Sequence, residues 1–456
     1  MRLVFLLIST LVFGTLSAQD SLTLKDFLSG VYNNHPLFGS AALNVDMAQG
    51  KLMAARGNFD PKIEYNSLSK EFKGTNYYNH SLTQLKIPVY SGIQVKAGYE
   101  LNSGYYLNPE LTTPTEGLFF TEISVPLLEG LLINQGRAEV MMQQAKLKQS
   151  EHELQLAQND LVYMISSAYW EFVASNELLG LYTEAVKVAE NRFDFVKKTY
   201  GLGKYAAIDT VEAYMEWQRR LSLLNEKRAA YNYTSYALSN QNWTSDSLEL
   251  VKFNPSWQHV FRVDSINNMA SQVQVSRHPA VMKIDEKLSA VSIDRTLQRQ
   301  NILPDLTLRY KPLTQGGQGL QYSSENFTWG ASFSMPLFFR KELGKLKATE
   351  SKVDQVLYER MFKVQTLSND IQAYKNAMEN WQNAMIAQRL NVLSAERMLD
   401  AEKRKLELGS ASIFMVNYRE RYLLEAQEKL IKARKEFNKA QSAYLNKLGI
   451  DILSYL

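Results

Sequence analysis

The apolar positions between Gly136 and Tyr200 repeat with the spacing of one long helix. This segment contains no proline and a single interior glycine, Gly180. In its second half, apolar residues recur at alternating steps of three and four: Leu179, Tyr182, Val186, Ala189, Phe193, Val196 and Tyr200. Such a seam lets a helix pack along a neighbour in a left-handed supercoil. At 1.5 Å per residue, about 65 residues extend roughly 100 Å, so the pattern predicts an elongated architecture.

A second helix of the same kind is predicted from about Gly344 to Leu408. Its seam comprises Val364, Leu367, Ile371, Tyr374, Met378, Trp381 and Met385. Both helices end at a glycine turn, Gly201-Leu202-Gly203 and Leu408-Gly409, as a C-terminal glycine cap requires. A shorter helix returns after each turn, so each half of the chain is predicted to contain a helical hairpin.

Other segments alternate strictly between apolar and polar residues, which is the pattern of strands. They are Ile93 to Leu101, Phe119 to Val125, Leu306 to Tyr310 and Phe327 to Met335. Strands of about nine to eleven residues cross an outer-membrane bilayer at a tilt. The alternative is a half-buried sheet in a soluble domain. The aromatic-rich apolar faces favour the membrane, because such barrels carry aromatic girdles at both interfaces.

The whole order of elements occurs twice. Asn34-His35-Pro36 recurs as Arg277-His278-Pro279, and Pro61 recurs as Pro304, both at a distance of 243 residues (278 − 35 and 304 − 61). This predicts a duplicated unit. The expected divisions are a signal peptide at 1–18; a first repeat at 19–241, with strands at about 61–127 and a long hairpin at about 130–241; a connector at 242–267; and a second repeat at 268–456, with strands at about 304–336 and a hairpin at about 344–449.

The N-terminus has the pattern of a cleaved secretory signal peptide. Arg2 precedes an apolar run from Leu3 to Leu16, and the predicted cut follows Ala18. A membrane anchor is the alternative, but the run is short for a span. No later segment has eighteen consecutive apolar residues, so we expect any membrane insertion of the exported chain to use strands.

Composition and motifs argue against an enzyme. The net charge is +4 with 21% charged residues, which gives no nucleic-acid signal, and there is no cysteine for a disulfide, thiol nucleophile or thiolate metal site. The sequence has no phosphate-binding loop and no nucleophile elbow, and His152-Glu153 lacks the second histidine of a zinc protease helix. The 5 histidines are scattered, so we expect no catalytic residue, metal or cofactor.

Taken together, these features resemble the TolC-like outer membrane efflux proteins over essentially the whole mature chain. The resemblance rests on the duplication, on the His-Pro and strand-opening prolines above, and on Ser124-Val125-Pro126-Leu127 with Ser334-Met335-Pro336-Leu337. Gly201-Leu202-Gly203 with Ile208-Asp209-Thr210-Val211-Glu212-Ala213 is similar to the turn and return helix at the family's periplasmic tip. The order and duplication of these motifs, rather than any one of them, carry the resemblance.

The resemblance implies a homotrimer in which strands form one shared outer-membrane β-barrel and helices form a periplasmic α-barrel continuous with it. It also implies a passive exit duct of a tripartite efflux or type I secretion system, working with a periplasmic adaptor and an inner-membrane pump. The runner-up is an exported coiled-coil scaffold without a pore. The scaffold explains the heptads but leaves the aromatic, alternating strands without a purpose.

The first half departs from the simplest version of the repeat. Pro61 to Pro126 spans 65 residues (126 − 61), whereas Pro304 to Pro336 spans 32 (336 − 304). The additional residues include two strand-like runs, Ser81 to Tyr90 and Ile93 to Leu101, on either side of Ser91-Gly92. The chain therefore has either a doubled first hairpin, with up to six strands, or four barrel strands and an extra β-element at the rim.

Two groups of site residues are predicted near the glycine turns. The adaptor-docking tips are Tyr200, Gly201, Leu202, Gly203, Ile208, Leu406, Leu408, Gly409, Ile413 and Phe414. Phe414 stands where the first tip has Asp209, so we expect the two tips to contact a partner differently. The possible gate carboxylates are Asp194, Asp209, Asp400, Glu402 and Glu407. In a trimer each would form a ring of three, which selects cations and resists opening; ordinary surface charge is the alternative.

Overall fold

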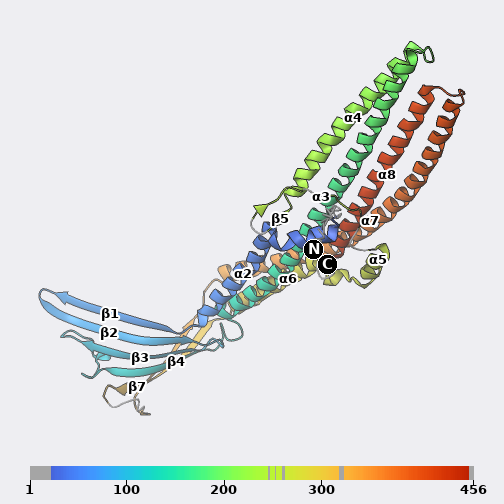
Figure 1. Ribbon diagram of the computed structural model, residues 1–456. Coiled ribbons are helices and arrows are strands. Elements are labelled where there is room, and N and C mark those ends of the chain that lie inside the picture. The colour runs from blue at the N-terminus through green and yellow to red at the C-terminus, as the bar shows by residue number, and fades with distance from the viewer. Residues whose placement is uncertain (1–21, 245–246, 252, 259–261, 318–322, 451–456) are drawn as a thin grey trace, which may run out of the picture. The chain divides into compact units, whose positions relative to one another are not determined.

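The computed structural model describes residues 22–244, 247–251, 253–258, 262–317 and 323–450 (Figure 1). The predicted signal peptide, residues 1–18, lies outside this part. The chain divides into two compact units, and each unit combines segments from both halves of the sequence. The first unit comprises Met1–Gly39, Ala157–Val273 and Ser368–Leu456, and the second comprises Ser40–Leu156 and Gln274–Leu367.

The second unit contains a six-stranded antiparallel sheet (Figure 1). Its strands are β1 (Lys62–Phe72), β2 (Thr75–Pro88), β3 (Gln94–Ser103), β4 (Leu118–Pro126), β7 (Asp305–Gln315) and β8 (Phe327–Ser334), adjacent in that order. The turn between β1 and β2 consists of Lys73 and Gly74, both with positive φ (53° and 74°), as a two-residue hairpin requires. The first hairpin is therefore doubled, which decides between the two strand counts in favour of six for this chain.

One face of this sheet carries apolar residues from every strand. The register aligns Ile63 with Leu85 and Ala97 on β1 to β3, and it aligns Ile123 with Tyr310 and Trp329 on β4, β7 and β8. Ile63 is 81% exposed and Trp329 is 70% exposed, so within the unit no element covers this face at either edge. The opposite face is polar and carries the ion pairs Lys96–Glu122 (2.8 Å) and Lys311–Glu100 (3.4 Å).

The helices of the second unit pack in pairs through small apolar clusters. They are most of α2 (Pro36–Arg56), the start of α3 (Gln135–Tyr200), α6 (Pro279–Gln300) and the start of α7 (Arg340–Glu407). Leu52 of α2 packs with Val140 of α3, Leu297 of α6 packs with Ala138 of α3, and Ile284 of α6 packs with Val353 of α7. Short 3₁₀ turns η2 (Gly57–Phe59), η3 (Pro109–Leu111) and η4 (Val275–Arg277) lie between the larger elements.

The first unit is helical and holds the largest core. It contains α1 (Leu24–Val31), η1 (Tyr32–Asn34), α4 (Ala207–Ser239), α5 (Val263–Gln272), α8 (Ile413–Leu448) and the later parts of α3 and α7. Trp170, Phe172 and Met378 are fully buried in its centre, where α1, α3, α4, α5, α7 and α8 meet. Tyr374 and Trp381 of the second predicted seam are partly buried against this core.

The connector after α4 is held against this core by one hydroxyl group. The Tyr169 hydroxyl lies 2.6 Å from the carbonyl oxygen of Leu22 and 2.8 Å from that of Ser256, and it accepts the Ser256 N–H at 3.0 Å. Burial raises the pKa of Tyr169 well above its ordinary value, so the hydroxyl stays protonated. The connector also contains two short strands that pair antiparallel, β5 (Trp243–Thr244) and β6 (Ser247–Leu248). The sequence patterns did not predict them.

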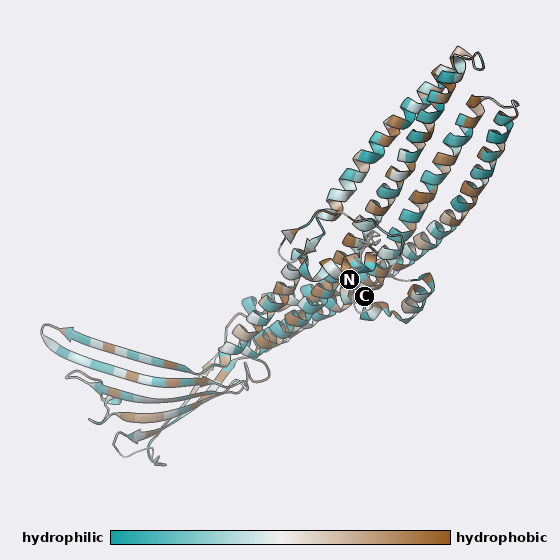
Figure 2. Ribbon diagram, in the orientation of Figure 1, coloured by the Kyte–Doolittle hydropathy of each residue, from teal (hydrophilic) through white to brown (hydrophobic). Residues whose placement is uncertain are grey.

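The helix patterns agree closely with the structure. Figure 2 shows hydrophobic and hydrophilic residues alternating along the long helices. The seams are buried at Tyr182 and Val196 of α3 and at Leu367 and Met378 of α7, whereas Tyr200 at the end of the first seam is 48% exposed. In the part of the chain that the structure describes, no helix combines the length and hydrophobicity needed to cross a membrane.

The two His-Pro motifs form matching helix caps. Nδ1 of His35 accepts the N–H of Leu37 at 3.2 Å, and Nδ1 of His278 accepts the N–H of Ala280 at 3.1 Å. Each histidine thereby satisfies a backbone donor at the start of α2 or α6, and the following proline occupies the first helical position. These two residues have a structural role in helix initiation. Among the residues described, no group of three or more His, Asp or Glu side chains is arranged to hold a metal ion.

Candidate functional site

The two long hairpins of the first unit turn through the same backbone motif. After α3, the N–H of Lys204 donates to the Thr199 carbonyl at 3.2 Å and that of Gly203 donates to Tyr200 at 2.9 Å. After α7, the N–H of Ser410 donates to Lys405 at 2.8 Å and that of Gly409 donates to Leu406 at 3.0 Å. Both are Schellman caps, with the glycine in the left-handed region at φ 75° and 76°.

Most of the predicted docking residues are exposed at these turns. Leu202 is 74% exposed, Ile208 is 70%, Leu408 is 82% and Phe414 is 55%. A methyl group added at Gly203 or Gly409 would meet no atom within 4 Å, so only the positive φ restricts these positions to glycine. Four large apolar side chains in solvent at two neighbouring helix ends form a surface suited to a protein partner.

Ile413 differs from the other predicted docking residues. It is 3% exposed and packs with Val196 of α3 and Ala213 of α4. Leu406 is half-buried against the same cluster. The structure therefore places these two residues in the apolar contact between the hairpins, beneath the exposed turns.

The predicted gate carboxylates fall into different environments. Asp194, Asp400 and Glu407 are exposed. Asp209 accepts the N–H of Ala206 at 2.9 Å and so caps the first turn of α4. Glu402 is buried on α7 and lies 3.7 Å from the guanidinium of Arg419 on α8. Within one chain these side chains do not come together as a single cluster, and their arrangement as rings stays a prediction.

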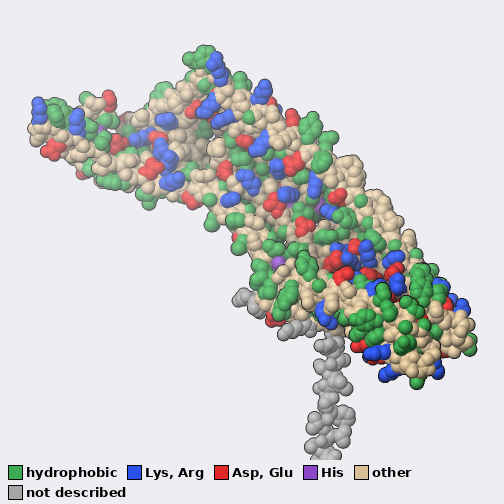
Figure 3. All heavy atoms as spheres, turned by 90° about the horizontal axis from the view of Figure 1, so that it is seen from above, with side chains coloured by type: hydrophobic (Ala, Val, Ile, Leu, Met, Phe, Trp, Pro, Cys, Tyr) green, Lys and Arg blue, Asp and Glu red, His purple; other side chains and the backbone are tan. Residues whose placement is uncertain are grey.

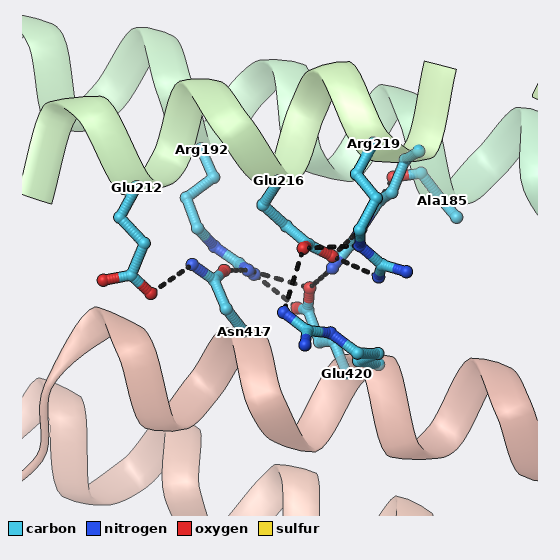
Figure 4. A network of polar contacts seen from close by, with 9 residues as sticks. Ala185, Arg192, Glu212, Glu216, Arg219, Asn417 and Glu420 are labelled. Carbon is cyan, nitrogen blue, oxygen red and sulfur yellow. Dashed lines mark hydrogen bonds and ion pairs between the residues drawn. The ribbon is translucent and has the colours of Figure 1, made fainter. Parts of the chain in front are cut away.

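A buried ion-pair network, absent from the sequence predictions, joins the two hairpins (Figure 4). Arg220 of α4 is 1% exposed and donates to Glu216 of the same helix at 2.9 Å and to Glu420 of α8 at 2.8 Å. Arg192 of α3 also binds Glu420 and donates to the Asn417 side chain at 2.6 Å. Three helices thus share one carboxylate.

Further contacts complete the network at its edges. Arg220 donates to the Ala185 carbonyl at 3.1 Å, and Arg219 pairs with Glu216 at 2.8 Å. Arg421 of α8 reaches back to Glu216 at 3.3 Å. Every buried charge therefore has an oppositely charged partner, which is the condition under which buried ions are tolerated.

Both buried carboxylates are held in their charged form. Burial alone would raise the pKa of Glu420, but the hydrogen bonds and charges of Arg192 and Arg220 outweigh it, so this pKa lies below its ordinary value. Burial would also raise the pKa of Glu216. The hydrogen bonds and charges of Arg219 and Arg220 outweigh burial, so this pKa is lowered as well. The network is consequently fully ionised at neutral pH.

The helix seams do not predict this network. The three-four seam of α8 runs through Leu423, Ala426 and Leu430, and its continuation four residues before Leu423 falls on Arg419, so Glu420 lies beside the seam. A carboxylate beside a seam does not by itself indicate a buried charge. The long hairpins repeat at a distance of 206 residues, as Ala189-Glu190 and Ala395-Glu396 show (395 − 189). The partner could not be identified from this repeat, because Arg220 corresponds to Ala426 (220 + 206), which carries no charge.

Comparison with known proteins relates this geometry to a family. A family model described as outer membrane efflux protein matches residues 271–449. Within this range, the sequence is therefore similar to the outer membrane efflux proteins. A search of curated protein sequences gives no match.

Solved structures of outer membrane channels share the fold of this chain. The outer membrane protein VceC of Vibrio cholerae is 15% identical with a TM-score of 0.68, covering 93% of this chain and 96% of its own. The open-state MtrE outer membrane channel of Neisseria gonorrhoeae is 14% identical with a TM-score of 0.68, covering 93% and 88%. The CmeC outer membrane channel of Campylobacter jejuni is 13% identical with a TM-score of 0.66, covering 93% and 85%.

These comparisons confirm several predictions from the sequence. The TolC-like fold class, the outer-membrane location with a periplasmic portion and the role as an outer-membrane duct of an efflux system are confirmed, and the pore-free scaffold has no support. The family consists of outer membrane channels, which are not enzymes. The trimer, the adaptor, the pump and the docking residues remain to be proposed.

Proposed function

We propose that this efflux protein acts as a homotrimer and forms the passive exit duct of a tripartite exporter. In this proposal an inner-membrane pump supplies the energy, and a periplasmic adaptor engages the two turns of each chain. The duct itself performs no chemical step. Substrates pass through it, and no cofactor takes part.

The observation that carries the proposal is the open sheet of the second unit. Its terminal strands β1 and β8 each leave one row of backbone hydrogen-bonding groups without a strand partner among the described residues. Its apolar face is exposed, with Tyr65 at 65% and Phe333 at 65%. Neither edge nor face is stable as it stands, because open edges aggregate and a membrane has no water to satisfy them.

Joining copies of the chain removes both difficulties. If β8 of one copy pairs with β1 of the next, the edges disappear and the sheet closes around an axis. With three copies the apolar face meets lipid on the outside and the polar face lines the lumen, as in other transmembrane barrels. Eighteen strands follow from six per chain (3 × 6), instead of the twelve that four strands per chain would give.

The adaptor is proposed to dock on the exposed turns. Leu202 and Leu408 are the most exposed apolar side chains among the predicted docking residues, at 74% and 82%. Ile208 and Phe414 lie on the first turns of the return helices, also exposed. Because Ile413 and Leu406 lie in the contact between hairpins, we assign them to keeping the two tips together rather than to docking.

The ion-pair network is proposed to set the resting position of the hairpins. Opening a helical duct at its tip requires one hairpin to move relative to another. The Arg220–Glu420 and Arg192–Glu420 pairs oppose that movement, because separating them would leave buried charges without partners. Binding free energy from the adaptor would have to offset this cost.

Conductance in a planar bilayer tests the duct. We expect purified protein to insert, to migrate as a heat-modifiable trimer in detergent, and to conduct in small steps that grow when Arg220 is replaced by alanine. A water-soluble oligomer without conductance would instead support the scaffold. Docking is tested in cells: Leu202→Asp with Leu408→Asp should abolish export while trimers remain, and unchanged export would contradict docking at the turns.

A further inference from the structure

A hollow between α7 and α8 contains two arginine side chains that the duct function does not use. The cavity has a volume of about 420 Å³ and is lined by Met385, Ile386 and Arg389 of α7 and by Leu430 and Arg434 of α8. All five residues belong to the first unit. The volume falls within the range of small-molecule sites, and the lining is apolar apart from the two guanidinium groups.

Neither guanidinium group is neutralised by the chain. Across the described residues, neither Arg389 nor Arg434 forms an ion pair, although most arginines around the network in Figure 4 do. Arg434 instead lies over the ring of Trp257, 4.6 Å from its centroid. Trp257 is fixed in turn, because it stacks on the buried Trp170 and its indole N–H donates to Glu177.

The electrostatics of Arg434 indicate a shortage of negative charge. Burial lowers the pKa of this guanidinium below its ordinary value; Glu177 acts against that change, and the positive charge of Arg389 adds to it. Repulsion between two cations beside an apolar hollow raises the free energy of the protein, and an anion bound between them lowers it again. Figure 3 shows Lys and Arg side chains interspersed with Asp and Glu over the face that it presents.

We propose that this hollow binds an amphiphilic monoanion, in which a carboxylate or sulfonate lies between Arg389 and Arg434 and a short apolar body lies against Met385, Ile386 and Leu430. A planar carboxylate suits a guanidinium because two parallel N–H···O hydrogen bonds form. Trp257 holds the Arg434 side chain in place before the anion arrives, which reduces the entropy lost on binding. The site requires neither the trimer nor adaptor docking.

The test uses the full-length protein in a neutral detergent, with 4-butylbenzoate as the probe and 4-butylbenzamide as its uncharged match. Equilibrium dialysis against a detergent blank measures the bound probe. We expect saturable binding of one benzoate per chain and at least tenfold weaker binding of the amide. Arg434→Gln and Arg389→Gln should each weaken benzoate binding at least tenfold, because each removes one of the two hydrogen-bonding cations.

Arg397→Gln is the matched control, since it removes the same charge from an exposed position of α7 outside the hollow. It should leave benzoate binding unchanged. Arg389 is also exposed, so its variant keeps the test valid if Arg434→Gln alters the fold, which far-ultraviolet circular dichroism would show. Absence of saturable binding would overturn the proposal, as would equal binding of acid and amide or equal binding by all variants.

Discussion

The two long hairpins end in turns that share one backbone geometry but begin their return helices in different ways. Both outgoing helices stop at a Schellman glycine with nearly the same φ, 75° at Gly203 and 76° at Gly409. The second return helix is capped by the Ser412 hydroxyl, which accepts the Met415 N–H at 3.4 Å. The first begins at Ala206, which has no side-chain acceptor, and relies on Asp209 alone.

This difference shows which part of a duplicated element is constrained by the backbone. A chain reversal after a helix needs a left-handed residue, so glycine occupies both positions. The residues that follow only have to satisfy helix-start donors, which serine or aspartate does equally well. The charges diverge further, because Glu420 and Asn417 of α8 contact Arg192 of α3 and Arg220 of α4.

The largest expected effect on stability comes from replacing Arg220 of the first hairpin by the residue type found at the equivalent position of the second. Arg220→Ala places there the residue type that Ala426 provides at the equivalent position. Removing one partner of a buried ion pair costs about 3–5 kcal/mol, because the remaining carboxylates stay buried. Thermal unfolding followed by circular dichroism should show a clear fall in the midpoint. Arg228→Ala, at an exposed position of the same helix, should change it little; equal shifts would contradict the importance of the network.

Valine substitutions at the two glycines test whether the turns are equivalent. Gly203→Val and Gly409→Val should each cost about 1–2 kcal/mol, because a left-handed conformation is strained for a residue with Cβ. The two losses should agree closely, since neither site has atoms within 4 Å of an added methyl group. Gly201→Ala is the control: its φ is not positive, and the added methyl would meet only an ordinary contact at 3.5 Å. A large difference between the two valine variants would show that the turns are not equivalent.

The caps give a smaller effect with opposite signs in the two hairpins. Ser412→Ala should destabilise by about 1 kcal/mol, as loss of an N-cap usually does. Ala206→Ser should stabilise, by about 0.5–1 kcal/mol, because it supplies the acceptor that the first return helix lacks. Hydrogen exchange of the first-turn amides would report both changes locally. If serine at position 206 gives no added protection, Asp209 already satisfies the start of α4.

Lowering the pH should weaken the ion-pair network, and this change should have the smallest effect on stability of those considered. The pKa values of Glu216 and Glu420 are lower in the folded protein than in the unfolded chain, so the unfolded state binds protons first as pH falls. Their contribution is complete above pH 4.3, the ordinary value for glutamate, and is lost as pH falls through the folded pKa values. The unfolding midpoint should fall less steeply between pH 5 and pH 3 in Arg220→Ala than in the wild type. If the midpoint fell equally steeply with pH in both proteins, Glu216 and Glu420 would not be the source of the acid sensitivity.

The sequence by itself determined the long helices and most of the strands and indicated the resemblance to the efflux family, for a physical reason. Helix seams, glycine caps and alternating strands are local patterns that depend on residues close together in the sequence. Each pattern occurs twice at a fixed distance, which strengthens its interpretation. The sequence predicts Leu202, Leu408 and Phe414 as docking residues because they adjoin the glycine turns; the structure shows that they are exposed, and their docking stays a prediction.

Only the tertiary structure decided which of these residues meet. Ile413 is the first residue of α8 and Ala207 is the first residue of α4, yet Ile413 is 3% exposed whereas Ala207 is exposed, because Ile413 packs against Val196 and Ala213 of the other hairpin. The partners in the Arg220–Glu420 pair are separated by 200 residues, and no periodicity within one helix specifies a contact between two. The six-strand count also awaited the register of β1 with β2, since alternation predicts a strand but does not reveal its neighbour.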